Sequence, residues 1–112
     1  MFGIKEIDAA TLQEKLAKGE KLRLIDVRSE GEFAQGIIPG AEFMPLHTVP
    51  LKLDELKASA DPIVFYCRSG NRSGQACFFL KQNTGVEALN LSGGIIAWYH
   101  SGNQIVAPTK AA

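Results

Sequence analysis

The segment Ile63–Tyr66 limits the possible folds more than any other part of the chain. Its four residues are hydrophobic and either β-branched or aromatic, which is typical of a strand buried on both faces of a sheet. Cys67 follows directly, and the pattern of Ser73–Gln82 predicts a helix. A buried strand that leads through a short loop into a helix favours an α/β domain, in which ligands bind beyond the carboxyl ends of the strands.

The same alternation of strand and helix is predicted along the rest of the chain. Gly19 and Gly36 are predicted to end helices that Asp8 and Ser29 cap. Pro50 must lie in the first turn of a helix over Leu46–Lys57 or break it. We therefore expect an α/β fold with a mainly parallel central sheet flanked by helices on both faces. The other strands are expected at Lys5–Ile7, Leu22–Val27, Ala41–Met44 and Val86–Leu91, and a last helix after the turn Ser92–Gly94 carries Ile95, Trp98 and Tyr99.

Length and charge limit the number of domains and the kinds of partner. The chain has 112 residues, 46% of them hydrophobic, which is enough for one compact core. We expect a single domain over residues 1–105 and a flexible C-terminal tail over residues 106–112, which are small and polar around Pro108. Twelve Lys and Arg balance twelve Asp and Glu. The overall charge therefore favours neither nucleic acid nor an acidic membrane as a partner.

The N-terminal sequence indicates a location inside the cell. Charged residues appear early, at Lys5, Glu6 and Asp8, so an apolar signal region is not expected. No stretch of hydrophobic residues reaches the length of a membrane span. The default prediction is a cytoplasmic protein, and the two cysteines, Cys67 and Cys77, fit a reducing compartment without a structural disulfide.

Cys67 is the leading candidate for a nucleophile, because it lies where a strand end, a turn and a helix start come together. Backbone N–H groups in such a turn, together with the N-terminus of the following helix, attract negative charge. The same dipoles, with the flanking Arg68 and Arg72, are expected to lower the pKa of Cys67 and hold it as thiolate near neutral pH. Gly70 permits a positive φ in this turn, and Ser73 can cap the helix.

Other reactive residue types in the chain have simpler structural explanations. Cys77 shares a predicted helix face with apolar residues, so we interpret it as core packing. Asp26 and Arg28 lie at the end of a predicted strand and are expected to form an ion pair that orders the neighbouring loops. His47 and His100 have no carboxylate or cysteine at metal-ligand spacing, so no metal site is predicted. The chain also lacks a nucleotide-binding glycine motif, and no cofactor is expected.

Five segments share their residues and their order along the chain with one known family. They are Leu24–Arg28, Glu32-Phe33 with Gly36, Ile38–Ala41, Cys67–Ser73, and Leu91–Gly94 with Ala97-Trp98. Together they resemble the rhodanese-like, or sulfurtransferase, family. The resemblance implies a single-domain rhodanese-like fold with Cys67 as the sulfur-carrying nucleophile. It also implies a substrate-binding cradle made of the residues that follow, namely Arg68, Ser69, Gly70, Asn71, Arg72 and Ser73.

Two positions depart from the family pattern. The family often has His where this chain has Ile38, and often Asn where this chain has Phe43. Ile38 lies in a predicted turn and Phe43 in the brief predicted strand that follows it, so both positions belong to the scaffold. We therefore expect the departures to affect local packing more than chemistry.

The reaction that the resemblance implies is the transfer of a sulfane sulfur. A Cys67 thiolate would take the outer sulfur of thiosulfate or a related small anionic donor, and the resulting persulfide would pass it to cyanide or a thiol acceptor. Neither step needs a cofactor. The N–H groups of the loop would stabilise charge on the sulfur and on the leaving anion.

Two other functions are left open by the sequence. A protein that relays persulfide to a protein acceptor would use the same cysteine and no additional catalytic residue. A phosphatase or arsenate reductase would also use a thiolate in an anion-binding turn, but those enzymes have five residues between Cys and Arg. Here four residues lie between Cys67 and Arg72, and Tyr66 stands where phosphatases commonly have His. The shorter loop favours a single sulfur atom at its centre.

Overall fold

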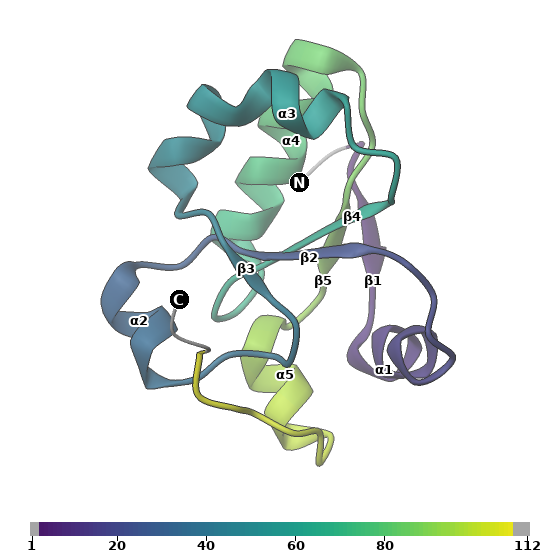
Figure 1. The fold of residues 1–112 in the computed structure, drawn as a ribbon, viewed down its shortest axis with the longest axis vertical. Helices are drawn as coiled ribbons and strands as arrows, with labels where there is room; N and C mark the ends of the chain where they lie inside the picture. Colours follow the sequence, from purple (N-terminus) through teal and green to yellow (C-terminus); the bar gives the residue numbers. More distant parts are fainter. Residues whose placement is uncertain (1–2, 109–112) are drawn as a thin grey trace.

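The centre of the protein is a sheet of five parallel strands, in a computed structural model that describes residues 3–108 (Figure 1). Strands alternate with helices along the chain, as the sequence predicts. This alternation follows from the parallel pairing, because parallel neighbours need a crossover rather than a tight turn. In chain order the elements are β1 (Lys5–Ile7), α1 (Ala9–Ala17), β2 (Arg23–Asp26), α2 (Glu30–Gln35), β3 (Glu42–Phe43), the 3₁₀ helix η1 (Leu46–Lys52), α3 (Leu53–Lys57), β4 (Ile63–Tyr66), α4 (Asn71–Thr84), β5 (Leu89–Leu91) and α5 (Gly94–His100).

The strand order places β4 in the middle of the sheet. The order is β1-β5-β4-β2-β3, so β4 pairs with β2 on one side and with β5 on the other. All four residues of β4 are buried, which confirms the prediction of a central strand. Because the strands are parallel, their carboxyl ends lie along one edge of the sheet, and Cys67 follows β4 at that edge.

Helices cover both faces of the sheet, with α3 and α4 on one face and α1 and α5 on the other (Figure 1). Neighbouring residues of a strand point to opposite faces. Ile25 and Phe65 therefore pack in the core under α4, whereas Leu24 and Val64 pack in the core under α1 and α5. Two covered faces explain why β4 is hydrophobic throughout, and why Leu24 and Ile25 of β2 are both buried although they point to opposite faces.

Several boundaries differ from the prediction for local reasons. The predicted helix Leu46–Lys57 is divided into η1 and α3, and Pro50 lies inside η1. A short 3₁₀ segment accommodates this residue, which has no N–H to donate. α4 begins at Asn71 instead of Ser73, because the left-handed Gly70 ends the loop earlier than expected. β5 is limited to Leu89–Leu91.

The C-terminal boundary of the fold also differs from the prediction. Val106, predicted as the first residue of a flexible tail, forms an antiparallel bridge with Ile37. The two N–H···O distances are 2.8 and 2.9 Å, so the segment after α5 pairs with the turn after α2. The bridge satisfies backbone groups of the buried Ile37, and the prediction for residue 106 is wrong. Residues 109–112 of the predicted tail lie outside the described residues.

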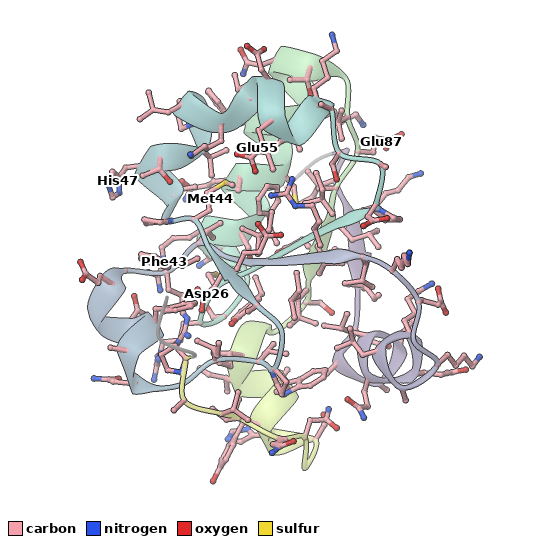
Figure 2. All side chains as sticks on the ribbon, viewed as in Figure 1. Asp26, Phe43, Met44, His47, Glu55 and Glu87 are labelled. Atoms are coloured by element: carbon pink, nitrogen blue, oxygen red, sulfur yellow. The ribbon has the colours of Figure 1, made fainter. Side chains whose placement is uncertain are left out.

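A buried ion pair joins Arg28 to Asp26, which lies at the carboxyl end of β2 and is labelled in Figure 2. Arg28 Nη2 lies 2.7 Å from Asp26 Oδ2, and the Arg28 backbone N–H also donates to Asp26 at 2.9 Å. The same guanidinium donates to the Gly36 carbonyl at 2.7 Å. Burial disfavours the charge on Arg28, but the hydrogen bonds to Asp26 raise the Arg28 pKa above its usual value. The predicted ion pair is present, and it ties the end of β2 to the end of α2.

Removal of the Asp26 carboxylate is expected to destabilise the fold strongly. Asp26→Ala leaves the Arg28 guanidinium buried without its partner, and such a change costs about 3–5 kcal/mol of unfolding free energy. Glu55→Ala is the matched control, because Glu55 pairs with Arg23 at the surface and Arg23 keeps Glu42. The control is expected to cost less than about 1 kcal/mol. Urea unfolding measures both values, and similar losses in the two variants would contradict a supporting role for the buried pair.

Candidate functional site

The loop that carries Cys67 is short because α4 begins directly after it. β4 ends at Tyr66 and α4 begins at Asn71, so residues 67–70 make the whole connection. Gly70 has a φ of 110°, in the left-handed region that favours glycine, and it caps α4 without a side chain. The first N–H groups of α4 are therefore available to the loop and to an anion bound in it.

The Cys67 sulfur is buried and accepts two hydrogen bonds. The Gly70 N–H lies 3.1 Å from Sγ, and the Ser73 hydroxyl lies 3.3 Å from it. Only 1% of the Cys67 surface is exposed. Burial by itself raises the pKa of this thiol, but hydrogen bonds from Ser73, Gly70 and Ser69 together lower the Cys67 pKa below its ordinary value. The geometry therefore favours the thiolate, as the sequence predicts.

The start of α5 holds the backbone of the same loop. The Ile95 N–H donates to the Cys67 carbonyl at 2.9 Å, and the Ile96 N–H donates to the Arg68 carbonyl at 3.2 Å. Gly94 has a φ of 60°, and a Cβ at this position would lie 2.6 Å from the Cys67 carbonyl oxygen and closer still to Arg68. The sequence indicates only a turn here. The close approach of two backbones explains why the last residue of this turn, Gly94, is a glycine.

Arg72 is paired with a carboxylate of α2. Its guanidinium makes two hydrogen bonds to Glu32, of 2.7 and 3.0 Å. The pairing with Arg72 lowers the pKa of Glu32 to about 2. Glu32 also forms a capping box with Ser29, so the ion pair joins the start of α4 to the start of α2. Sequence reasoning missed Glu32 as a site residue, although Glu32 belongs to a segment that matches the family.

Asn90 is a second residue that sequence reasoning missed. It lies on β5, is 3% exposed, and accepts the Ser73 hydroxyl at 2.6 Å. Its amide also donates to the Gly70 carbonyl at 3.1 Å. The sequence signal for it was a polar residue between Leu89 and Leu91 in a strand predicted to be buried.

The remaining predicted binding residues form the rim of the loop. Arg68, Ser69 and Asn71 are exposed. A hollow of about 520 Å³ opens beside Arg72. Phe43 and His47 also line this hollow and lie on the same side of the molecule (Figure 2). The hollow therefore reaches the start of α4, where Arg72 is one of its lining residues.

The family departures at Ile38 and Phe43 have structural explanations. Ile38 is fully buried in the core under α1 and α5, and its N–H donates to the Tyr66 hydroxyl at 3.2 Å. Phe43 packs against Phe33, with the ring centroids 4.6 Å apart. Both side chains contribute to local packing, as expected from the sequence.

The remaining cysteine and the two histidines make no hydrogen bond to the Cys67 sulfur in the described part of the chain. Cys77 lies in the core under α4, where burial raises its pKa to about 12. His47 and His100 are exposed.

Within residues 3–108, no group of three or more His, Cys, Asp and Glu side chains could hold a metal ion. In that same part of the chain, no helix combines the length and the apolar character that crossing a membrane requires.

Comparison with protein families gives a match over most of the chain, because the rhodanese-like domain model aligns with residues 8–101. The chain belongs to the rhodanese-like family. A sulfurtransferase of Allochromatium vinosum is 47% identical over 105 residues, which cover 94% of this chain and 97% of that protein. Human thiosulfate:glutathione sulfurtransferase is 32% identical over 111 residues, covering 88% of this chain and 96% of that protein. A rhodanese-like domain protein from Staphylococcus aureus superposes with a TM-score of 0.80 at 30% identity, covering 95% of this chain and 100% of that chain.

These similarities confirm the predicted family and fold, and they identify the chain as a sulfurtransferase of the rhodanese family. In this rhodanese domain, Gly70 and Ser73 donate to the Cys67 sulfur, whereas Arg68, Ser69 and Asn71 are exposed. The Arg72 side chain extends from the start of α4, next to the loop, and its guanidinium pairs with Glu32 of α2. The Asp26–Arg28 pair lies at the neighbouring strand end and makes its hydrogen bonds to the scaffold.

Substitution of Gly94 is expected to displace the rhodanese loop. Gly94→Ala places a methyl group against the Cys67 and Arg68 carbonyls, and the combined backbone strain and overpacking should cost about 2–4 kcal/mol of unfolding free energy. Gly102→Ala is the matched control, because Gly102 also has a positive φ but no atom within 4 Å of its missing Cβ. The control should cost about 1 kcal/mol. Urea unfolding and the rate of Cys67 alkylation check both variants, and equal effects would contradict the close approach.

Proposed function

We propose that the protein transfers a sulfane sulfur from thiosulfate or a related anionic donor to cyanide or a thiol acceptor, through a persulfide on Cys67. The convergence of the Gly70 and Ser73 donors on the Cys67 sulfur carries this proposal. Donors at these distances favour the thiolate, which is the nucleophilic form. The name of the human relative, thiosulfate:glutathione sulfurtransferase, supports thiosulfate as donor and a thiol as acceptor.

In the first half-reaction, the Cys67 thiolate attacks the outer sulfur of thiosulfate. A bond forms between Sγ and that sulfur, the S–S bond of thiosulfate breaks, and its electron pair leaves with sulfite. The product is a persulfide anion whose charge lies on the outer sulfur. Loop N–H groups stabilise this charge as an oxyanion hole stabilises an oxygen. No proton moves in this step.

In the second half-reaction, cyanide or a thiolate attacks the outer sulfur of the persulfide. The bond between Sγ and the outer sulfur breaks, and Cys67 leaves as a thiolate. The hydrogen bonds from Gly70 and Ser73 stabilise this leaving group. Two half-reactions joined by one covalent intermediate give ping-pong kinetics.

The rim of the loop is proposed to hold the anionic donor. Arg68, Ser69 and Asn71 supply exposed polar groups, and Arg72 supplies a guanidinium at the start of α4. Arg72 already binds Glu32, so a donor must share or displace that carboxylate. Donor affinity is therefore set by competition between two anions for one guanidinium.

Relay of persulfide to a protein partner is a second candidate function. The hollow beside Arg72 has an aromatic residue on its wall, Phe43, which is 38% exposed. Exposed aromatic residues are enriched where proteins bind one another. A relay would use the same Cys67 persulfide and would differ only in the acceptor.

Thiosulfate is expected to add one sulfur atom to wild-type protein. Intact-protein mass spectrometry after incubation with thiosulfate should show this gain, and cyanide or a small thiol should remove it. Cys67→Ser should gain no sulfur because the nucleophile is absent. Cys77→Ala is the control and should still be loaded, since Cys77 lies in the core.

Three outcomes of this experiment would change the proposal. Sulfur loading that persists in Cys67→Ser would remove Cys67 from the mechanism. Turnover of an aryl phosphate without any sulfur loading would favour a phosphatase. Transfer to a single protein acceptor, with cyanide and small thiols inactive, would favour the relay.

Changes at the Arg72–Glu32 pair are expected to alter donor capture in opposite directions. Arg72→Ala should raise the KM for thiosulfate by roughly tenfold, because a charged hydrogen-bond donor is lost. Glu32→Gln should lower that KM, since it keeps the shape of the side chain and removes the competing charge. Added salt should weaken capture more in wild type than in Arg72→Ala. Steady-state kinetics at several salt concentrations measures these effects, and equal salt sensitivity would count against Arg72 as a donor-binding residue.

A further inference from the structure

The side chain of Asn90 lies behind the loop that carries Cys67. Asn90 is the middle residue of β5, and it stands in register with Phe65 of β4 and Glu6 of β1. Side chains in register share a face of the sheet, so Asn90 lies on the face that Phe65 and α4 occupy. It is a nearly fully buried polar residue in a strand between two hydrophobic cores. A buried amide in this position must be held by hydrogen bonds.

The hydrogen bonds of Asn90 fix the orientation of its amide. Nδ2 lies 3.1 Å from the Gly70 carbonyl and 3.1 Å from a carboxylate oxygen of Glu6. Both of these groups only accept hydrogen bonds, so the NH₂ group must face them. Oδ1 then faces Ser73, and it can only accept the Ser73 hydroxyl proton.

The Ser73 hydroxyl therefore has one proton and two acceptors. Asn90 Oδ1 lies 2.6 Å from Ser73 Oγ, and Cys67 Sγ lies 3.3 Å from it. Ser73 is fully buried, so its hydroxyl depends on hydrogen-bond partners inside the protein. A charged sulfur is a much stronger acceptor than a neutral one. A negative charge on Sγ therefore shifts the preference of the hydroxyl proton from Asn90 toward the sulfur.

We propose that Asn90 is a positioning residue, whose Oδ1 accepts the Ser73 proton while Cys67 carries the persulfide and releases it to Sγ when the thiolate returns. The inference rests on the proposed sulfur transfer. In the persulfide the charge lies on the outer sulfur, and Sγ is a weak acceptor. Asn90 then keeps the buried hydroxyl satisfied. In the thiolate form the proton turns to Sγ and stabilises the charge.

Most of the charged groups near the loop are already paired in the structure. Arg72 is paired with Glu32, Arg28 is paired with Asp26, and the Glu6 carboxylate receives the Asn90 amide. Arg68 is exposed at the rim of the loop. The hydroxyl proton of Ser73 is thus the internal group that follows the charge of the sulfur. Asn90 lowers the cost of forming the persulfide by giving that proton a second acceptor.

An exchange equilibrium tests this role directly. Each protein is equilibrated with a fixed mixture of thiosulfate and sulfite, at a pH above the Cys67 pKa, and mass spectrometry gives the ratio of persulfide to thiolate. Asn90→Ala should lower this ratio about fivefold, because the hydrogen bond that favours the persulfide is lost. Ser73→Ala should raise it, since the thiolate loses its donor. In the double variant Ser73→Ala/Asn90→Ala, removal of Asn90 should have no further effect on the ratio.

Alkylation of Cys67 as a function of pH provides a second measurement. Asn90→Ala should lower the Cys67 pKa, because Ser73 then donates to sulfur without competition, and Ser73→Ala should raise it. Asn83→Ala is the matched control, because Asn83 is exposed on α4 and its side chain donates to the Phe79 carbonyl of the same helix. It should change neither the ratio nor the pKa.

The outcomes separate this inference from the proposed function. A wild-type protein that gains no sulfur would overturn the sulfur transfer and, with it, the role of Asn90. A second outcome would overturn the role of Asn90 and leave the sulfur transfer standing. In it, wild type gains sulfur, but Asn90→Ala changes the persulfide ratio equally whether residue 73 is Ser or Ala. Asn90 would then act only through Gly70. If Asn90→Ala does not fold, Ser73→Ala decides: a raised ratio supports the shared proton, and an unchanged or lowered ratio overturns it.

Discussion

The hydrogen bonds to the Cys67 sulfur are the interaction on which the site depends. A thiolate loses its hydration when it is buried, so burial alone would keep Cys67 neutral. The donors from Gly70 and Ser73 reverse this preference. Burial also makes these bonds stronger, because little water competes for the sulfur. The same environment that would suppress the thiolate therefore supports it once the donors are in place.

The fold supplies these donors by holding one loop from several elements. The sulfur of Cys67 faces the start of α4, and the carbonyl of Cys67 accepts a hydrogen bond from Ile95 at the start of α5. β5 adds the amide of Asn90 from the side. The nearby guanidinium groups of Arg28 and Arg72 are each matched by a carboxylate. Neutral groups of the backbone and of buried side chains thus stabilise the sulfur, and their effect is only weakly screened by salt.

The part of this arrangement that is local in sequence could be predicted from the sequence. The hydrophobic run of β4, the loop and the start of α4 are contiguous, so their residue pattern is sufficient to place Cys67. The missed residues act across the fold, since Glu32 meets Arg72 from 40 residues away and Asn90 meets Ser73 from 17 residues away. A single polar residue in a buried strand indicates that a partner exists, but it does not identify the partner. The pairing of Ile37 with Val106 was missed for the same reason.

The surroundings of Cys67 also favour chemistry that moves no proton. Tyr66 occupies the position before the cysteine, and its hydroxyl accepts the Ile38 N–H inside the core. Burial raises the pKa of Tyr66, so the phenol stays neutral and structural. Among residues 3–108, the side chain that donates to the Cys67 sulfur is a serine, not a carboxylic acid or a histidine. Phosphoryl and acyl transfer usually need an acid for the leaving group. Sulfur transfer between anions leaves a stable thiolate or sulfite, so hydrogen-bond donors are sufficient for it without a proton-donating acid.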